Sequence, residues 1–325
     1  MKTNLFPIAL FALLVAVCNE EPEQVAPITD STDLACQVQI ISNTFEYEDE
    51  FNRGEGTSSI WFSYNADKSI SKINGSFTEL YCYTDAGVEQ CENFQSASEY
   101  SFTYTNGIIS DVTIEEDGQN STDIIEFTYL DNRLTKVKFS EDGYDEFDEF
   151  RFIYGDGGKL EKLENWDNYS GPNTSLVLYG YDEFIWTANN VTTVNSYSQN
   201  FKSDEPASRL SKLKGSKNPF EIREMKRTSN QMRLTATAPE LSYRLNLVYD
   251  SNSNPLFGNL PYLIWDGEFY SYLSQNNPSR ITEIEYYDGT QEEYINDFTY
   301  SYNEKGFPTT ITNDGETLEL TYNCD

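Results

Sequence analysis

The sequence contains no histidine, and basic residues are scarce, with 22 Lys and Arg against 54 Asp and Glu and a formal net charge of −32. Without imidazole, the chain cannot form Ser-His-Asp or Cys-His catalytic sites or histidine-ligated zinc. Nucleic-acid binding needs Lys and Arg to neutralise phosphates, so the charge excludes an extended nucleic-acid surface. The same charge argues against the protein body lying on an anionic membrane.

Long apolar runs are also absent, except for one at the N-terminus. Lys2 precedes an apolar stretch of 13 residues, Leu5 to Val17, which is interrupted only by Pro7. This run is too short to span a bilayer, which takes about 20 residues. Acidic residues follow it, so its layout is that of a secretory signal peptide. We therefore interpret residues 1–17 as a signal peptide.

Cysteine is infrequent, with five in the chain, and the first stands directly after the apolar run. Residues 14–18 resemble the bacterial lipobox, in which the cysteine carries a thioether-linked diacylglycerol, although Val17 occupies a position where a small residue is usual. The resemblance implies a lipid on Cys18 that anchors the chain to a membrane. An ordinary secretory signal with an incidental cysteine is the alternative. Residues 18–33 would form a flexible tether, and residues 34–325 a single folded domain.

Four cysteines remain after Cys18, and an even number in an exported chain favours two disulfides. Three pairings can be drawn, and we favour Cys82–Cys91 with Cys36–Cys324. The first closes a short hairpin-like loop, and the second ties the start of the domain to its last strand, where the entropic gain is largest. Free thiols or a metal cluster are the alternatives. With no histidine and no CxxC spacing, we predict no metal and no cofactor.

The dominant pattern is alternation at period two. In Ile125–Tyr129 the apolar side chains fall on one face, Asp131 and Asn132 follow as a turn, and Val137 and Phe139 alternate again. This pattern predicts a strand, a turn and a second strand. One unit recurs along the chain. It consists of a strand with the pattern aromatic-x-Tyr, a turn of Asp, Asn or Gly, and an aliphatic strand. We predict an all-β fold, a long antiparallel meander of repeated hairpins in a strongly twisted sheet or barrel-like arrangement.

Helical patterns are few. We expect short helices over residues 205–214 and 260–273. The hairpin rhythm lapses over residues 195–240, where basic residues gather. We interpret this stretch as a large excursion or as the boundary between two halves of the domain.

Three late segments, residues 247–256, 276–282 and 300–308, resemble a group of Bacteroidetes lipoproteins described as a domain of unknown function with a porin-like fold. The hairpin unit resembles the loose YD-type repeat, and the acidic residues after Cys18 resemble the export signal of such lipoproteins. The resemblance implies an outer-membrane, lipid-anchored protein facing the cell surface or the periplasm. The group has no established activity, so the resemblance gives no enzymatic activity to expect of this chain.

Carboxylates are the catalytic groups that this composition leaves available. The densest runs are residues 46–50 and 141–149. We interpret both as solvated hairpin edges that discourage aggregation. A calcium site and a glycosidase pair are the alternatives. We predict no catalytic residue and a non-enzymatic protein.

Aromatic residues are abundant, with 24 tyrosines and four tryptophans. On strands of period two, most should be core residues or cross-strand pairs. Those in less regular stretches are candidates for stacking on a ligand. These candidates are Trp166, Tyr169, Trp265, Tyr270 and Tyr272.

Two functional hypotheses follow. The first is an interaction or structural module of the envelope, contacting a protein or an envelope polymer. The second is a surface glycan-binding protein. Both predict contact with the membrane through the lipid alone and no nucleic-acid partner, and both leave the oligomeric state open.

Overall fold

The computed structural model describes eleven stretches of the chain and shows them to be almost entirely antiparallel strand, which confirms the predicted all-β meander. The described residues are 36–48, 52–85, 88–121, 123–141, 145–155, 157–168, 176–198, 239–261, 273–287, 290–313 and 316–324. The expected signal peptide, the expected tether with Cys18 and the helix expected over 205–214 lie outside them. Of the helix expected over 260–273, Leu260, Pro261 and Leu273 are described and have helical backbone.

Nine strands form a first sheet, sheet A, in the order β16-β17-β18-β1-β2-β3-β4-β5-β6. Their bounds are β1 Gln37–Glu48, β2 Asn52–Tyr64, β3 Ile70–Asp85, β4 Val88–Thr105, β5 Ile108–Glu116, β6 Gln119–Asn120, β16 Thr299–Tyr302, β17 Pro308–Asn313 and β18 Glu316–Asn323.

Nine further strands form sheet B, in the order β15-β14-β13-β12-β11-β10-β9-β8-β7. Their bounds are β7 Asp123–Leu130, β8 Arg133–Glu141, β9 Phe147–Tyr154, β10 Leu160–Asp167, β11 Val177–Thr187, β12 Asn190–Ser198, β13 Glu240–Ser253, β14 Asn276–Tyr287 and β15 Thr290–Asp297.

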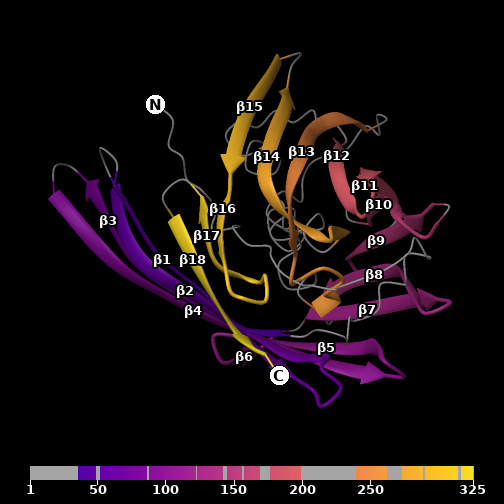
Figure 1. Ribbon diagram of the computed structural model, residues 1–325, viewed down its shortest axis with the longest axis horizontal. Helices are drawn as coiled ribbons and strands as arrows, with labels where there is room; N and C mark the ends of the chain where they lie inside the picture. Colours follow the sequence, from indigo (N-terminus) through magenta and orange to yellow (C-terminus); the bar gives the residue numbers. More distant parts are fainter. Residues whose placement is uncertain are drawn as a thin grey trace.

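The meander divides into two sheets, and neither of them closes on itself (Figure 1). The chain runs through β1 to β6 in sheet A, continues through β7 to β15 in sheet B, and returns for β16 to β18. The last strand, β18, pairs with β1. At the second change of sheet, only Phe298 separates the end of β15 from the start of β16.

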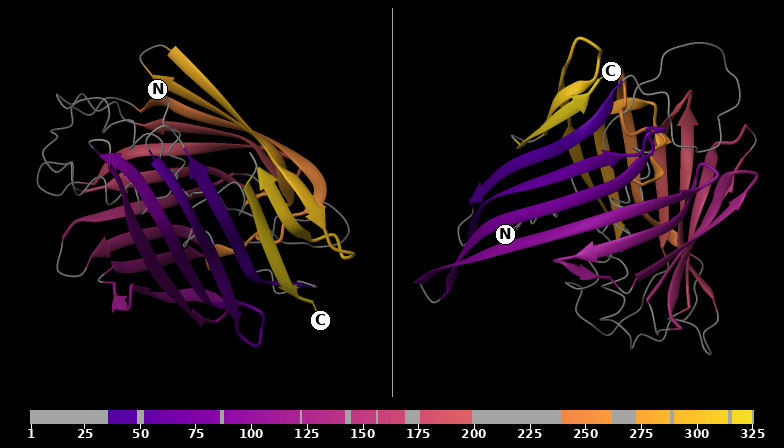
Figure 2. Two further views of the ribbon diagram at one scale, coloured as in Figure 1. Left: turned by 90° about the vertical axis from the view of Figure 1, so that its left-hand side faces the viewer. Right: turned by 90° about the horizontal axis from the view of Figure 1, so that it is seen from below.

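The core lies between the two sheets, which face each other as layers (Figure 2). Every second residue of a strand points inward, as the alternation predicts. Ile41, Phe62 and Ile73 of sheet A and Phe150 and Leu245 of sheet B belong to one buried cluster. Burial of each such side chain contributes about 1.5–3 kcal/mol. Among the described residues, no helix has the length and apolarity needed to cross a membrane.

The tight turns use the residues that accept a positive φ. The two-residue loop between β4 and β5 consists of Asn106 and Gly107, with φ of 53° and 78°. The loop between β7 and β8 consists of Asp131 and Asn132, at 52° and 60°. Two positive φ values in succession match the twist of a two-residue hairpin. These residues therefore set the register of their hairpins.

The second aromatic residue of the hairpin unit has a structural role. Its hydroxyl or indole N–H donates a hydrogen bond to a backbone carbonyl on another strand. The pairs are Tyr64–Val38, Tyr104–Ile70, Tyr154–Leu134, Trp186–Leu160, Tyr249–Val191, Tyr300–Pro278 and Tyr322–Pro308. Six of these pairs join neighbouring strands of one sheet. Tyr300 instead reaches from β16 in sheet A to β14 in sheet B, so this bond holds the two sheets together.

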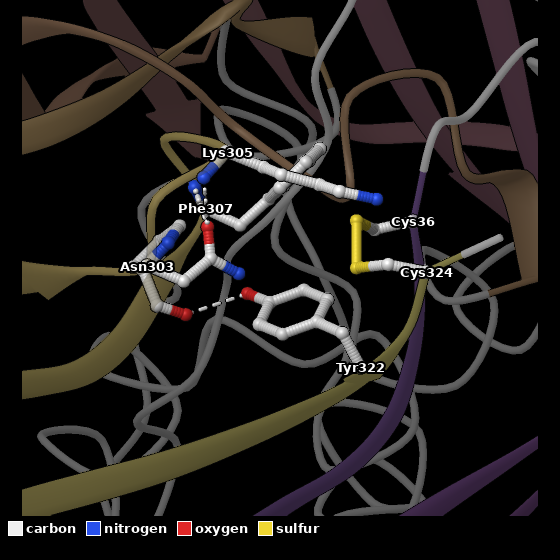
Figure 3. Close-up of a disulfide and its surroundings, with 7 residues drawn as sticks. Cys36, Asn303, Lys305, Phe307, Tyr322 and Cys324 are labelled. Atoms are coloured by element: carbon white, nitrogen blue, oxygen red, sulfur yellow. Dashed lines mark hydrogen bonds between the residues drawn. A yellow bond between two sulfur atoms is a disulfide. The ribbon is translucent and has the colours of Figure 1, made fainter.

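Both disulfides have the pairing that the sequence predicts, Cys36 with Cys324 and Cys82 with Cys91. Cys36–Cys324 lies at the start of β1 and the end of β18 (Figure 3). Beside it, Tyr322 packs against Phe307 with 5.5 Å between ring centroids. Cys82 and Cys91 face each other across β3 and β4.

Candidate functional site

Trp166 lies on β10, on the outer face of sheet B, opposite the core. Its indole N–H donates to Glu164 Oε2 at 3.0 Å. The guanidinium carbon of Arg151 stands 4.4 Å from the ring centroid. One ring face and the N–H are therefore already engaged within the protein. The other stacking candidates, Tyr169, Trp265, Tyr270 and Tyr272, lie outside the described residues.

A row of polar and aromatic side chains crosses five strands of this outer face. Register places them side by side in the order Lys136, Arg151, Glu164, Tyr181 and Tyr197. The rings of Tyr181 and Tyr197 stack at 4.6 Å between centroids. We call these residues, together with Glu149, Lys162 and Trp166, the sheet B belt.

Ion pairs hold the belt together. The Glu149 side chain is only 8% exposed, and its two oxygens meet Lys136 Nζ at 3.1 Å and Arg151 Nε at 2.6 Å. Burial alone would raise the pKa of Glu149, but the hydrogen bonds from Arg151 and Lys136 outweigh it and hold the pKa below its ordinary value. The carboxylate is therefore the stable form at this position.

Lys162 completes the belt. Its Nζ stands 3.9 Å from the centroid of the Tyr181 ring and 3.0 Å from Glu164 Oε1. Burial would raise the pKa of Glu164, but hydrogen bonds from Trp166 and Lys162 lower it below the ordinary value. Each cation of the belt thus meets a carboxylate or a ring of the same protein, which makes the belt self-contained.

The far end of sheet A is built differently. β3 and β4 have 16 and 18 residues, whereas β8 and β9 have nine and eight. At about 3.3 Å per residue, β4 is about 60 Å long and β9 about 26 Å. The far ends of β1 to β4 extend away from sheet B (Figure 1). Along β4, residues 90–97 are exposed on both faces, so this end of sheet A is a single layer.

Among the residues whose side chains the structure describes, five aromatic ones line one face of this extension, the face that continues from the core. They are Phe45, Phe77, Tyr81, Tyr83 and Phe94, and we call them the distal aromatic face. Ring centroids lie 5.7 Å apart for Phe45–Phe77, 5.7 Å for Tyr81–Tyr83 and 6.4 Å for Tyr81–Phe94. Phe94 is 45% exposed. Phe45 is buried and Phe77, Tyr81 and Tyr83 are partly buried, so Phe94 is the most exposed ring of the row. Exposed apolar surface can mark an interaction site.

A glycine in β2 allows the Phe45 ring to lie against the sheet. Gly56 faces Phe45 across β1 and β2. A Cβ added at Gly56 would collide with the Phe45 ring and with the Thr78 carbonyl oxygen. A larger residue at this position would therefore displace the ring that begins the aromatic row.

Two acidic residues, Glu79 and Glu92, share the distal aromatic face with the rings. Tyr81 faces Glu92 directly across β3 and β4, and Phe94 faces Glu79. The Tyr83 hydroxyl lies 3.0 Å from Gln90 Oε1 and 3.2 Å from Glu92 Oε1. The described strands place no Lys or Arg on this part of the face.

The sequence contained one indication of this face that our predictions did not use. Phe77, Tyr81 and Tyr83 are two or four positions apart, so they fall on one face by period two. Turn residues occur at Asn74-Gly75 and at 85–87, but Asn74 and Gly75 lie inside β3, so turn signals did not give the length of this strand.

The last two acidic residues of the run 141–149 differ from the predicted role of the run, whereas Asp145 is exposed as expected. We expected solvated hairpin edges, but Asp148 and Glu149 are both buried. The reason is that β9 begins at Phe147, which directs Asp148 to the inner face and brings Glu149 between Lys136 and Arg151. Asp148 faces the buried Asp167 across β9 and β10, so the two form no open carboxylate pair. Within the described part of the chain, no group of three or more Cys, Asp and Glu could hold a metal ion.

The three segments that resemble Bacteroidetes lipoproteins meet at the junction of the sheets. Asp250 accepts hydrogen bonds from the backbone N–H groups of Asn252 and Asn277, at 2.9 and 3.3 Å, and from the Tyr302 hydroxyl. Asn277 is fully buried. Donor groups surround this carboxylate, so it joins strands and does not present oxygen ligands to a cation. The segments that carry the resemblance thus have a structural role in this chain.

Comparison with known proteins adds two similar structures. No family model and no curated protein matches the chain. A porin-like protein from Bacteroides uniformis is 11% identical, with a TM-score of 0.47 over 88% of this chain and 96% of that one. A porin-like protein from Bacteroides vulgatus is 10% identical, with a TM-score of 0.23 over 88% of this chain and 98% of that one. At these scores neither similarity carries an argument about function.

Proposed function

We propose that this protein is a non-enzymatic, lipid-anchored module of the cell envelope, and that it binds a partner through the distal aromatic face. The observation that carries the proposal is the exposure of Phe94 at the end of a row of rings on a single-layered extension. Sheets in globular domains bury an apolar face against a second layer. Here the second layer would be supplied by the partner.

The proposed anchor is the lipid on Cys18, in the outer membrane and facing the cell surface or the periplasm. The sequence supports it, because Cys18 follows the apolar run at the point where polar residues begin. Changing Cys18→Ser should release the protein into the soluble fraction and abolish incorporation of labelled lipid. Unchanged incorporation of labelled lipid would disprove the anchor.

The binding face is tested by retention on envelope material. Full-length protein in detergent would be mixed with envelopes of the producing bacterium and sedimented. We expect Phe94→Ser to lower the bound fraction several-fold. Ile185→Ser is the matched control, because Ile185 is 51% exposed on the outer face of sheet B. Equal retention of both variants and the parent protein would contradict the proposed face.

Glycan binding is the second candidate function. The arrangement that favours it is the row of rings beside hydrogen-bonding groups, with Tyr83 next to Gln90 and Glu92. Aromatic rings stack on the apolar faces of sugars. Carboxylate and amide oxygens accept hydrogen bonds from sugar hydroxyl groups. Calorimetry against a polysaccharide panel tests this function. A glycan whose binding is lost in Phe94→Ser would support it, and no measurable affinity for any glycan would reject it.

A further inference from the structure

The two disulfides differ in their access to solvent. Cys91 is exposed on β4, although its partner Cys82 is buried. In the other disulfide, Cys36 is buried and Cys324 is half-buried. A thiolate reduces a disulfide by direct attack on one of its sulfur atoms, so access decides which bond is broken first. Cys82–Cys91 is therefore the bond that an external thiol reaches.

The sheet ends beside Cys91. Among the described strands, β4 has a neighbour on its far side only from Ser98 onward, where β5 pairs with it. Residues 90–97 lie before that neighbour or at its margin, and they are exposed. Because Glu92 and Phe94 point to the distal aromatic face, Cys91 points to the opposite, outer face. An external thiol can therefore approach Cys91 from the outer face of sheet A and from its edge.

The strand pairing keeps the two cysteines opposite each other after reduction. Cys82 pairs directly with Cys91, and β3 and β4 continue to pair on both sides of them. The sequence separation is nine residues, against 288 for the other disulfide. Closing a loop over a short separation costs less entropy than closing a long one. The bond between β3 and β4 is therefore readily formed again when an oxidant returns.

The far ends of β3 and β4 depend on this bond more than the strands of the core do. Residues 90–97 are exposed on both faces, so burial contributes little to holding this part of β4 in place. Strand pairing without buried contacts opens at a low free energy. The rings of the distal aromatic face belong to both strands, with Tyr81 and Tyr83 on β3 and Phe94 on β4. Their arrangement therefore depends on the pairing that the disulfide secures.

We infer that Cys82–Cys91 is a reversible redox switch, which small thiols open and whose opening loosens the far ends of β3 and β4. Cys36–Cys324 stays closed under the same conditions and keeps the rest of the fold intact. The switch goes beyond the proposed binding function and does not depend on the identity of a partner.

The reaction is thiol–disulfide exchange. A thiolate attacks the sulfur of Cys91 and forms a mixed disulfide with it. The bond to Cys82 breaks, and the electron pair leaves with the Cys82 sulfur, which takes up a proton. A second thiolate attacks the external sulfur of the mixed disulfide and releases Cys91, which is protonated in turn. Two external thiols are thus oxidised to one disulfide, and the protein disulfide is reduced to two thiols.

Thiol trapping tests which bond opens. Full-length protein in detergent would be incubated for graded times with cysteamine, a cationic thiol that the net charge of −32 does not repel. Free thiols would be alkylated with iodoacetamide and assigned by peptide mass spectrometry. We expect Cys82 and Cys91 to be alkylated about tenfold faster than the other pair. Equal rates for the two pairs, or a faster rate for Cys36 and Cys324, would overturn the inference.

Hydrogen exchange tests the loosening. After selective reduction, the amides of residues 77–83 and 90–96 should exchange about tenfold faster than in the oxidised protein. The amides of β8 to β10 in sheet B should exchange at the same rate in both states. Unchanged exchange at residues 77–83 and 90–96 would show a bond without a switching role. Faster exchange in β8 to β10 would show that reduction unfolds the protein as a whole, and either result would overturn the inference.

A double variant, Cys82→Ser with Cys91→Ser, is the control for the source of the effect. Its far strand ends should exchange as fast as those of the reduced parent protein, and cysteamine should not change that rate. A response of this variant to cysteamine would assign the effect to another cysteine and overturn the switch. In the parent protein, replacing cysteamine with its disulfide, cystamine, should restore slow exchange. Exchange that stays fast after this replacement would contradict the reversibility of the switch.

Discussion

The sheet B belt and the distal aromatic face use the same kinds of residue to different ends. In the belt, Glu149 and Glu164 meet Lys136, Arg151 and Lys162 of the same protein. On the distal aromatic face, Glu92 and Phe94 are exposed, and the nearby strands supply no cation on that face. The comparison suggests that the sheet B belt contributes to stability, whereas the distal aromatic face remains available to a partner.

Removing the disulfides should produce the largest effect and test how far the distal end depends on the core. Cys36–Cys324 spans 288 residues and Cys82–Cys91 spans nine. Loop entropy predicts that replacing the first pair with alanine lowers the free energy of unfolding by about 5 kcal/mol, and the second by about 2–3 kcal/mol. Urea unfolding measures both losses. A larger loss from the second pair would show that the distal end stabilises the core.

Asp182→Asn should stabilise the protein near neutral pH. Asp182 lies opposite Ser196 on the inner face of sheet B, and burial raises its pKa to about 6, in spite of its hydrogen bond with Ser196. Its ionisation therefore opposes folding above pH 6, and the penalty disappears below about pH 4, where folded and unfolded states both bind the proton. We expect the variant to gain about 2 kcal/mol at pH 7 and nothing at pH 4. An equal gain at both values would contradict the assignment.

Glu149→Gln should destabilise with the opposite dependence on pH. The lowered pKa of Glu149 means that its stabilising contribution is present above the unfolded value of 4.5 and is lost as the pH falls through the folded value. We expect a loss of about 1–2 kcal/mol at pH 7, discounted for the exposure of its partners. The loss should vanish at low pH. Glu92→Gln, from the distal end, should cost less than about 0.5 kcal/mol, and equal costs would remove the distinction between the two faces.

Tyr300→Phe tests the junction where the two regions meet. The variant removes the hydroxyl that donates to the Pro278 carbonyl oxygen at 2.6 Å. Loss of one such bond should cost about 1 kcal/mol in urea unfolding. Hydrogen exchange should show faster opening of β16 than in Tyr104→Phe, where the lost bond lies within sheet A. Identical exchange in the two variants would mean that the bond between sheets has no special role.

Phe94→Ser should have the smallest effect on stability. Because Phe94 is 45% exposed, little of its apolar surface leaves water on folding, and the change should stay within about 0.5 kcal/mol. Binding of a hydrophobic dye should fall in the same variant. A loss above about 1 kcal/mol would place Phe94 in the core and not on a free face.

Much of the fold could be predicted from local patterns. Alternation identified the strands, Asn106 and Gly107 identified a hairpin turn, and cysteine spacing led to both disulfides. The division into two sheets could not be predicted, because period two shows which residues share a face and not which sheet a strand joins. At the second change of sheet, Phe298 alone connects β15 to β16, and Asn296 and Asp297 before it belong to β15, so the local residues do not show that the chain changes sheet.

The candidate site was less accessible to sequence reasoning. Trp166 was identified as a stacking residue, but its contact with Arg151 depends on the register of β9 against β10. The exposure of Phe94 depends on where sheet B ends relative to sheet A, which is a tertiary property. The only local signal was the period-two spacing of Phe77, Tyr81 and Tyr83.

The pairing of β1 with β18 has a mechanical consequence. A pull on the chain ahead of Cys36 reaches the fold at the disulfide and passes through a covalent bond to Cys324. The first strand cannot then be peeled away from the last, and the load is shared between β1 and β18 in shear. Under tension from a tether, the load would enter at Cys36 and Cys324, at the opposite end of these strands from the far ends of β3 and β4.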